Sequence, residues 1–169
     1  MNRGHKFAGM IRRITATDFD YIYQLYMHPA TNPYLLYGVM EEASFRPIFN
    51  ELLEKNIIYV FEDVDKTIGM FKLIPLLHRN SHIAYLGGLA IHPDYAGKGY
   101  GKKMMEEIIT LGKQMGLIRI ELSTAIINDK AIALYEKVGF EKEGVLRKYT
   151  YLKSEGKFLD EVMMSYLYK

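Results

Sequence analysis

Residues 92–104 read HPDYAGKGYGKKM, and Gly97, Gly99 and Gly101 stand at alternate positions in this stretch. Before it, residues 82–91 have the pattern of a strand, and behind it apolar residues recur at helical spacing: Met104, Met105, Ile108, Ile109 and Leu111. A strand, a short glycine-rich turn and a helix N-terminus together bind anions, because backbone N–H groups point into the turn and the helix dipole favours negative charge. Glycine also permits a positive φ and a close approach of the anion. The stretch therefore predicts an anion site, with a plain flexible turn as the alternative.

Two well-known phosphate loops do not fit this stretch. A P-loop needs Gly, four residues and then Gly-Lys-Ser/Thr. Gly101 and Lys102 would require Gly at 96 and Ser or Thr at 103, where the chain has Ala96 and Lys103. A dinucleotide fingerprint that starts at Gly97 requires Gly at 102, where Lys102 stands. Both patterns are excluded.

The composition predicts a soluble globular protein with a single domain over residues 1–169. Hydrophobic residues make up 49% of the chain and charged residues 25%, the usual balance of such proteins. Lys and Arg number 22 against 20 Asp and Glu, a formal net charge of +2. Proteins that bind nucleic acid usually concentrate far more positive charge, so we expect no nucleic-acid partner.

Several classes of protein are excluded by what the chain lacks. It has no cysteine, which excludes disulfides, thiolate nucleophiles and Cys-based zinc sites, and we expect no metal. No apolar run approaches the roughly 18 residues of a membrane span. The N-terminal stretch MNRGHKFAGMIRR has no apolar core of the kind found in signal peptides. We therefore expect a cytoplasmic protein with no membrane contact.

Apolar periodicity and turn residues predict alternating strands and helices. We expect helices from a Thr17 N-cap to the loop set by Pro29 and Pro33, from Ser44 to Asn56, from the glycine turn to Gly116, and from Asn128 to Gly139. We expect strands at residues 11–14, 57–62, 67–76, 82–91, 117–124, 145–152 and 158–167, with an Asp65-Lys66 turn in the first hairpin and a 154–157 turn in the last. The order β-α-α-β-β-β-α-β-α-β-β predicts an α/β (α+β) fold with a central mixed sheet flanked by helices.

Two segments resemble the GCN5-related N-acetyltransferase (GNAT) superfamily. In LAIHPDYAGKGYGKKM, Gly99 and Gly101 match the two glycines of the family's Arg/Gln-x-x-Gly-x-Gly/Ala loop, although Ala96 replaces the usual Arg or Gln. NDKAIALYEKVGF, residues 128–140, keeps every position of Asn-x-x-Ala-x-x-Leu-Tyr-x-x-x-Gly-Phe. The expected order of elements also agrees with this family over nearly the whole chain. The resemblance implies an acyl-CoA N-acyltransferase fold.

The resemblance implies that acetyl-CoA is the cosubstrate. Its pyrophosphate would lie on the glycine turn, and its pantetheine would pair with the strand before the turn. Ala96 is expected to weaken this site and not to abolish it, since most donors are backbone N–H groups. The cofactor-binding residues carried over are Leu89, Ala90, Ile91, Ala96, Gly97, Lys98, Gly99, Tyr100, Gly101, Lys102, Asn128 and Tyr135.

Gly87 and Gly88 interrupt the strand before the turn. Glycine inside a strand often marks a bulge or a close approach by another backbone. In the family a bulge opens the sheet at this place, and by resemblance the N–H of Leu89 donates to the thioester carbonyl. Removal of such an oxyanion donor raises a reaction barrier by about 2–4 kcal/mol. A glycine pair kept only for helix packing is the alternative.

Tyr135 matches the family's general acid, which protonates the leaving thiolate, while its alternative role is packing of the helix face. No general base is evident. Some relatives have Glu four residues before the oxyanion donor, where this chain has Tyr85. Neutral Tyr is a poor base at pH 7, so deprotonation through water is expected. We expect a structural role for His92 and a solvated His82.

The acceptor is expected to be a small-molecule amine or a peptide N-terminus. Tyr34, Glu41 and Tyr85 are the candidate acceptor-binding residues, and Glu42 lies beside Glu41. The tyrosine-rich region consists of the first two expected helices, the loop that joins them and the final hairpin. Its alternative role is an aromatic core under a lid. The leading function is an acetyl-CoA-dependent N-acetyltransferase that acts by direct attack of the amine. The alternatives are a non-catalytic acyl-CoA-binding module and a nucleic-acid or partner-binding domain, and family analogy makes a homodimer possible.

Overall fold

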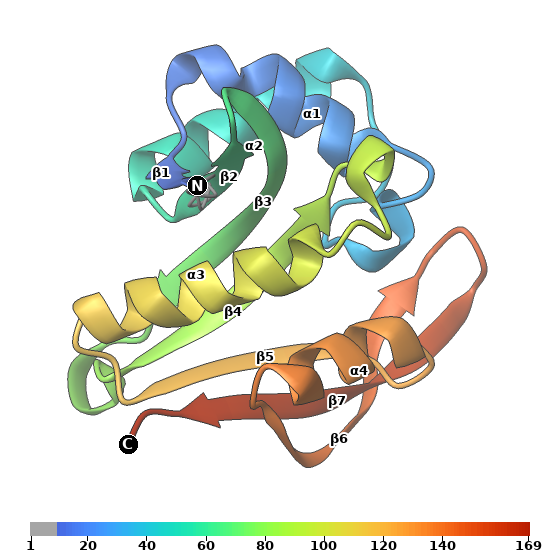
Figure 1. Ribbon diagram of the computed structural model, residues 1–169. Coiled ribbons are helices and arrows are strands. Elements are labelled where there is room, and N and C mark those ends of the chain that lie inside the picture. Colours follow the sequence, from blue (N-terminus) through green and yellow to red (C-terminus); the bar gives the residue numbers. More distant parts are fainter. Residues whose placement is uncertain (1–9) are drawn as a thin grey trace. The chain divides into compact units, whose positions relative to one another are not determined.

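The computed structural model describes residues 10–169 (Figure 1). The stretch MNRGHKFAG, part of the N-terminus for which no signal peptide is predicted, lies outside the described residues. Within residues 10–169 no helix is long and apolar enough to cross a membrane. The strands are β1 (Met10–Arg13), β2 (Ile58–Asp63), β3 (Lys66–Pro75), β4 (Ile83–Ile91), β5 (Arg119–Ala125), β6 (Glu141–Leu152) and β7 (Lys157–Leu167). The helices are α1 (Phe19–Met27), α2 (Glu42–Lys55), α3 (Tyr100–Gln114) and α4 (Asp129–Lys137).

The predicted fold class is confirmed. Over the described residues the strands hydrogen-bond in the order β1-β2-β3-β4-β5-β7-β6, and the order of strands and helices along the chain is the predicted one. The sheet is mixed, because β4 and β5 are parallel whereas β1 and β2, β5 and β7, and β6 and β7 are antiparallel. Four short 3₁₀ segments complete the regular structure between residues 10 and 169: Ala16–Asp18, Asn32–Tyr34, His78–Asn80 and Pro93–Tyr95.

Several predicted boundaries are wrong by a few residues. A 3₁₀ turn takes up Thr17, and Asp18 is the N-cap of α1. Helix α2 begins at Glu42, before the expected Ser44, because the Glu41 carbonyl already accepts the Ser44 N–H. The first hairpin turns at Val64 and Asp65, whose positive φ values of 47° and 62° suit a two-residue hairpin loop.

Two strand starts also differ from the prediction. Strand β5 begins at Arg119, since Leu117 and Ile118 still belong to the turn after α3. Strand β6 begins earlier than expected, at Glu141, which pairs with Ser165 of β7. Polar residues dominate this first part of β6, so it carries no apolar alternation that sequence patterns would detect.

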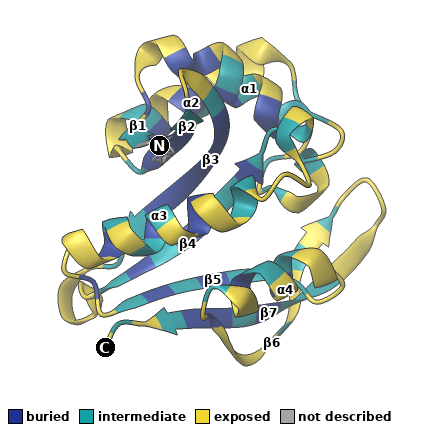
Figure 2. Cartoon of the chain, in the orientation of Figure 1, coloured by how far each residue is buried: buried dark blue, intermediate teal, exposed yellow. Residues whose placement is uncertain are grey.

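The described residues form two compact units. The first contains the chain up to Phe71 together with Gly88–Ile108. Its core joins α1 and α2 to β2, β3 and the end of β4, and Figure 2 shows the buried residues along β2 and β3. Phe19 and Phe49 pack edge to face with ring centroids 5.1 Å apart, and Tyr26 is fully buried against Phe45. Part of the tyrosine-rich region is therefore core, as the alternative interpretation held.

The second unit contains Lys72–Gly87 and Ile109–Lys169. Its β6–β7 hairpin is irregular at two places, between Lys142 and Gly144 and between Leu146 and Thr150. At the second place, Leu146 pairs with Glu161 and Thr150 pairs with Leu159. The three residues of β6 between these pairs therefore lie opposite Asp160 alone. The Lys148 N–H donates to the Asp160 side chain at 2.7 Å, which holds the irregular segment to β7.

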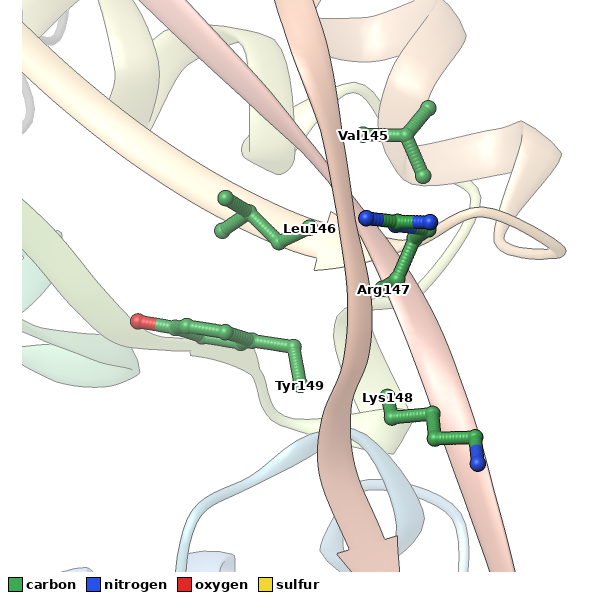
Figure 3. Close-up of a pocket in the computed structure, with 5 residues that line it drawn as sticks. All are labelled: Val145, Leu146, Arg147, Lys148 and Tyr149. Atoms are coloured by element: carbon green, nitrogen blue, oxygen red, sulfur yellow. The ribbon is translucent and has the colours of Figure 1, made fainter.

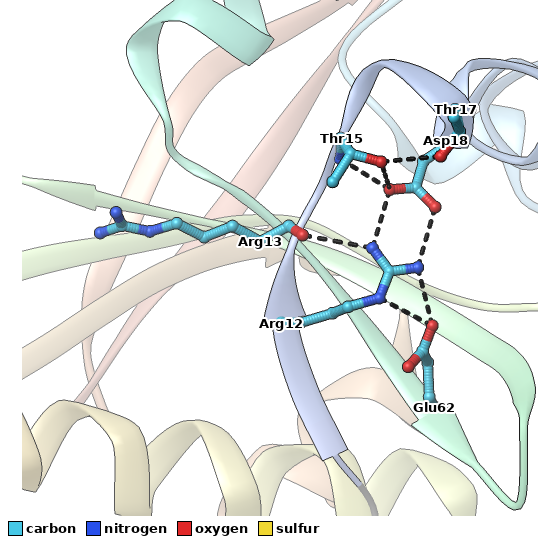
Figure 4. Close-up of polar contacts among 6 residues, drawn as sticks. All are labelled: Arg12, Arg13, Thr15, Thr17, Asp18 and Glu62. Carbon is cyan, nitrogen blue, oxygen red and sulfur yellow. Dashed lines mark hydrogen bonds and ion pairs between the residues drawn. The ribbon is translucent and has the colours of Figure 1, made fainter.

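An ion-pair network fastens the N-terminal strand of the first unit to the start of α1 (Figure 4). The Arg12 guanidinium donates to both carboxylate oxygens of Asp18, at 2.8 and 2.9 Å, and its Nε donates to Glu62 at 2.9 Å. Asp18 is only 8% exposed, and it also accepts the Thr15 N–H at 2.7 Å. Burial by itself raises the pKa of Asp18, but the hydrogen bonds from Arg12 and Thr15 outweigh it and lower the pKa below its ordinary value.

We expect Asp18→Asn to lower the free energy of unfolding at pH 7 by about 1–3 kcal/mol, because it weakens a charged hydrogen-bond network that is partly shielded from water. A lowered folded-state pKa gives stability that is fully present above the unfolded pKa, about 3.9, and is lost as the pH falls through the folded value. The difference in the free energy of unfolding between the wild type and Asp18→Asn should therefore become smaller below about pH 4. Urea denaturation at several pH values measures it.

Glu42→Gln is the matched control for this network. It removes an ion pair with Arg46 in which both side chains are more than half exposed, so its effect should stay below about 1 kcal/mol. Equal effects of the two substitutions would contradict the importance given to the Asp18 network.

Candidate active site

The glycine turn connects β4 to α3 in the first unit. Gly97 and Gly99 have φ values of 72° and 82°, a region that side chains with a Cβ rarely adopt. A Cβ at either glycine would meet no atom within 4 Å, so the glycines serve the backbone conformation and not close packing. The turn residues 96–99 are all exposed. This is the backbone geometry that the sequence predicts for an anion-binding turn.

The turn leaves several N–H groups open at the start of α3. Gly99 accepts the first helical hydrogen bond, from the Lys103 N–H at 3.3 Å. The N–H groups of Tyr100, Gly101 and Lys102 therefore have no partner inside the helix and lie at the positive end of its dipole. Ala96 differs from the prediction, because its N–H donates to the Pro93 carbonyl at 3.1 Å. The open donors thus begin after Ala96.

Lysines beside the turn add positive charge, and each lysine contacts a group within a few residues of it in the sequence. The Lys98 ammonium donates to the Asp94 carbonyl at 3.1 Å, Lys102 lies 3.5 Å from Glu106, and Lys103 lies over the Tyr100 ring. His92 caps the short helix before the turn, because its Nδ1 accepts the Asp94 N–H at 3.2 Å. This contact supports the structural role predicted for His92.

The end of β4, residues 88–91, is half-buried to buried in the first unit. Strand β4 runs unbroken through Gly87 and Gly88, so the predicted interruption is wrong, although the φ of 56° at Gly88 makes the backbone irregular at this place. Gly69 of β3 lets the backbone of β4 approach closely, since a Cβ there would lie 2.5 Å from the Ala90 carbonyl oxygen. The oxyanion role of the Leu89 N–H stays a prediction.

Tyr135 lies on α4 in the second unit and is 8% exposed. Its ring packs against Phe140 with centroids 6.0 Å apart. Burial, and then the neighbouring phenol of Tyr85, raise the pKa of Tyr135 to about 12. The phenol therefore keeps its proton at neutral pH and is a weaker acid than an unperturbed tyrosine.

Asn128 acts as the N-cap of α4. Its Oδ1 accepts the Ala131 N–H at 3.4 Å, and its Nδ2 lies 3.3 Å from the Thr124 hydroxyl. Asn is one of the preferred residues at this cap position, which agrees with the predicted helix start at Asn128. The cofactor contact carried over by resemblance stays a prediction.

A hydroxyl and carboxylate cluster surrounds Tyr85 in the second unit. The Tyr85 oxygen lies 3.0 Å from the Ser123 oxygen, and Ser123 in turn donates to one oxygen of Glu161. Thr150 donates to the other Glu161 oxygen. Sequence reasoning found Tyr85 and missed the other three residues, which belong to no motif and lie on three different strands. The available signal was the acidic pair Asp160 and Glu161 between apolar residues of β7.

A pocket of about 520 Å³ lies at the irregular part of β6 and is lined by residues 145–149 (Figure 3). In this view Leu146 and Tyr149 point to one side of the strand, and Arg147 and Lys148 point to the other. Leu146 pairs with Glu161, so the pocket adjoins the Tyr85 cluster within the second unit.

The remaining candidate residues are exposed. Tyr34, in the 3₁₀ segment after α1, is 66% exposed. Glu41 is the exposed N-cap residue of α2, and Glu42 pairs with Arg46 at 3.0 Å. His82 is exposed before β4, as predicted. In residues 10–169 no cluster of three His, Asp or Glu side chains is suited to a metal ion.

Known proteins resemble this chain in sequence and fold. Residues 19–140 match the acetyltransferase (GNAT) family. Spermidine N(1)-acetyltransferase of Vibrio cholerae is 30% identical over 118 residues, 68% of this chain and 64% of that protein. The ribosomal protein bS18-alanine N-acetyltransferase of Escherichia coli is 35% identical over 66 residues, 39% of this chain and 45% of that protein.

Solved structures confirm the fold. The crystal structure of spermidine N-acetyltransferase from Vibrio cholerae in complex with CoA and spermine superposes with a TM-score of 0.83 at 24% identity, over 95% of both chains. Ribosomal-protein-alanine N-acetyltransferase from Brucella melitensis gives 0.77 at 18% identity, over 94% of this chain and 99% of that one. These similarities concern the fold alone.

Proposed function

The chain belongs to the acetyltransferase (GNAT) family, and we propose that this acetyl-CoA-dependent N-acetyltransferase acetylates a primary amine of a small molecule or a peptide N-terminus. The observation that carries the proposal is the exposed turn at Gly97 and Gly99, which leaves the N–H groups at the start of α3 open. Family membership alone leaves open whether a chain has kept its cofactor site. Open donors at a helix N-terminus suit a pyrophosphate.

The turn residues fit coenzyme A by the chemistry of their donors. The N–H groups of Gly97 to Lys102 would hold the pyrophosphate, with Lys98 and Lys102 adding positive charge. Residues 89–91 would pair with the pantetheine, and Asn128 would contact the cofactor near its pantetheine end. Acetyl-CoA supplies an activated acetyl thioester to this site.

The chain's own groups have two further roles in the proposal. The Leu89 N–H donates to the thioester carbonyl oxygen, where negative charge grows when the amine attacks. Tyr135 holds a proton that it gives to the leaving sulfur. The amine attacks in its neutral form, so the excess proton of its ammonium form leaves to solvent before the attack. The new C–N bond replaces the C–S bond, the nitrogen loses one N–H proton to solvent as the amide forms, and solvent returns a proton to Tyr135.

The proposed acceptor class follows from the relatives. One relative is named for spermidine and another for the alanine of a ribosomal protein. These names support both a small amine and a peptide N-terminus as acceptor classes. Tyr34 and Glu41 remain proposed acceptor-binding residues. Because acetyl-CoA is produced inside cells, we propose a cytoplasmic location. The single domain over residues 1–169 and the homodimer stay predictions.

Thiol release from acetyl-CoA tests the proposal directly. Spermidine and a peptide that begins with alanine serve as first acceptors, followed by a broader panel of primary amines. Turnover with any of them supports the proposed function. Binding of CoA without turnover on any amine would instead support a non-catalytic acyl-CoA-binding module.

We expect Ala96→Arg to tighten CoA binding about threefold to tenfold, because a guanidinium adds a charged donor beside the turn. Ala96 is exposed and its backbone is extended, so a long side chain fits there without repacking. Ala96→Glu, of similar length and opposite charge, should weaken binding. Isothermal titration calorimetry with CoA measures both, and equal dissociation constants for the two variants would contradict a phosphate site at the turn.

We expect Tyr135→Phe to lower kcat about 100-fold or more, the usual effect of removing a general acid, while the fold is retained because the ring stays. The KM for acetyl-CoA should change little. Tyr166→Phe is the matched control, since the Tyr166 ring also packs against Phe140, with ring centroids 5.7 Å apart. Steady-state kinetics measure both variants. A Tyr135→Phe variant with the kcat of the wild type would show that Tyr135 only packs against its neighbours.

A further inference from the structure

The cluster around Tyr85 is a directed chain of hydrogen bonds within the second unit. Glu161 of β7 accepts from two hydroxyls, those of Ser123 on β5 and Thr150 on β6. The Ser123 oxygen also lies 3.0 Å from the Tyr85 oxygen. All four side chains are half-buried, so the chain is shielded in part and still reachable.

Glu161 fixes the direction of every bond in this chain. A carboxylate accepts hydrogen bonds and donates none, so the Ser123 proton points to Glu161. Ser123 has a single proton and can then only accept from Tyr85. The Tyr85 proton is therefore committed to Ser123, and the lone pairs of the Tyr85 oxygen are left for another donor.

Tyr85 lies near Tyr135, the proposed general acid, within the second unit. Its phenol is near enough to Tyr135 to raise the pKa of that residue, and Tyr149 from the β6 pocket acts on Tyr85 in the same way. Burial raises the pKa of Tyr85, and its hydrogen bond with Ser123 offsets this only in part. Tyr85 therefore stays neutral, and an oxygen with free lone pairs adjoins the proposed general acid.

We propose that Glu161 is a positioning residue that acts through Ser123 to present the Tyr85 oxygen as a hydrogen-bond acceptor for an N–H of the attacking amine. The inference rests on the proposed function and names part of its acceptor site. A neutral primary amine has two N–H groups and one lone pair. Donation of one N–H to Tyr85 holds the nitrogen and leaves its lone pair free for the thioester.

In this role Tyr85 does not have to remove a proton from the amine, for which a neutral phenol is a poor base. It also explains why a polar chain of hydroxyls ends on a carboxylate beside the β6 pocket. Arg147 and Lys148, whose charges would repel a cationic amine, point to the other side of β6 from Tyr149 (Figure 3). The acceptor class selected is therefore an amine that donates a hydrogen bond.

Glu161→Gln tests the direction of the chain with almost no change of shape. The amide can donate to Ser123, which lets Ser123 donate to Tyr85 and turns the Tyr85 proton toward the amine. We expect the KM for the amine to rise about tenfold or more, the usual effect of one lost hydrogen bond in a partly shielded site. The KM for acetyl-CoA should be unchanged. The acceptor is spermidine or the alanine peptide, whichever the wild type acetylates.

Three further single variants and a double-mutant comparison separate positioning from general stability. Ser123→Ala should match Glu161→Gln, and Ser123→Thr should restore the KM for the amine because it keeps the hydroxyl. Thr150→Val removes the other donor to the same carboxylate and should leave the KM for the amine within about twofold of the wild type. In a Tyr85→Phe background Glu161→Gln should have no further effect, since the two act through one contact.

The outcomes distinguish this inference from the proposed function. If the wild type turns over an amine and Glu161→Gln raises the KM for that amine alone, the inference is supported. Equal kinetics in wild type and Glu161→Gln, or equal losses in Ser123→Ala and Ser123→Thr, overturn it and leave the proposed function standing. A wild type that releases no thiol with any amine overturns both.

Discussion

The proposed chemistry depends on a backbone constraint at Gly97 and Gly99. Their left-handed conformation lets the chain leave β4 and enter α3 within a few residues, so that the first N–H groups of α3 face outward with no partner in the helix. A residue with a Cβ adopts this conformation only with strain. Donors fixed in advance by the backbone need no side-chain ordering when an anion binds, which explains how the turn can work with Ala96 in place of a cationic or amide side chain.

The proposed mechanism gives two tyrosines of the second unit different roles, because their surroundings differ. Tyr135 is buried beside Phe140, which raises its pKa to about 12 and keeps its proton in place. Tyr85 is tied through Ser123 to the carboxylate of Glu161, so its proton is already committed. In the proposed mechanism the first gives a proton and the second accepts a hydrogen bond. Identical side chains thus acquire separate roles through burial and through the direction of their hydrogen bonds.

Sequence patterns predicted what is local along the chain. The glycine turn, the Asn128 cap and the order of strands and helices follow from periodicity and from residues with special backbone preferences, and the structure confirms them. The cap of α1 was misplaced because a 3₁₀ turn capped by Thr15, whose N–H donates to Asp18, precedes the helix. Glu161 was missed because only strand pairing brings it to Ser123. Contacts made across strands have no signature in one sequence.

The most direct measurement of the central claim is an NMR titration of the isotope-labelled protein with CoA and, separately, with pantetheine, which lacks the pyrophosphate. The account predicts that the backbone amide signals of residues 97–102 shift when CoA binds and stay in place with pantetheine. Unmoved amides at saturating CoA, or equal shifts with both compounds, would contradict it.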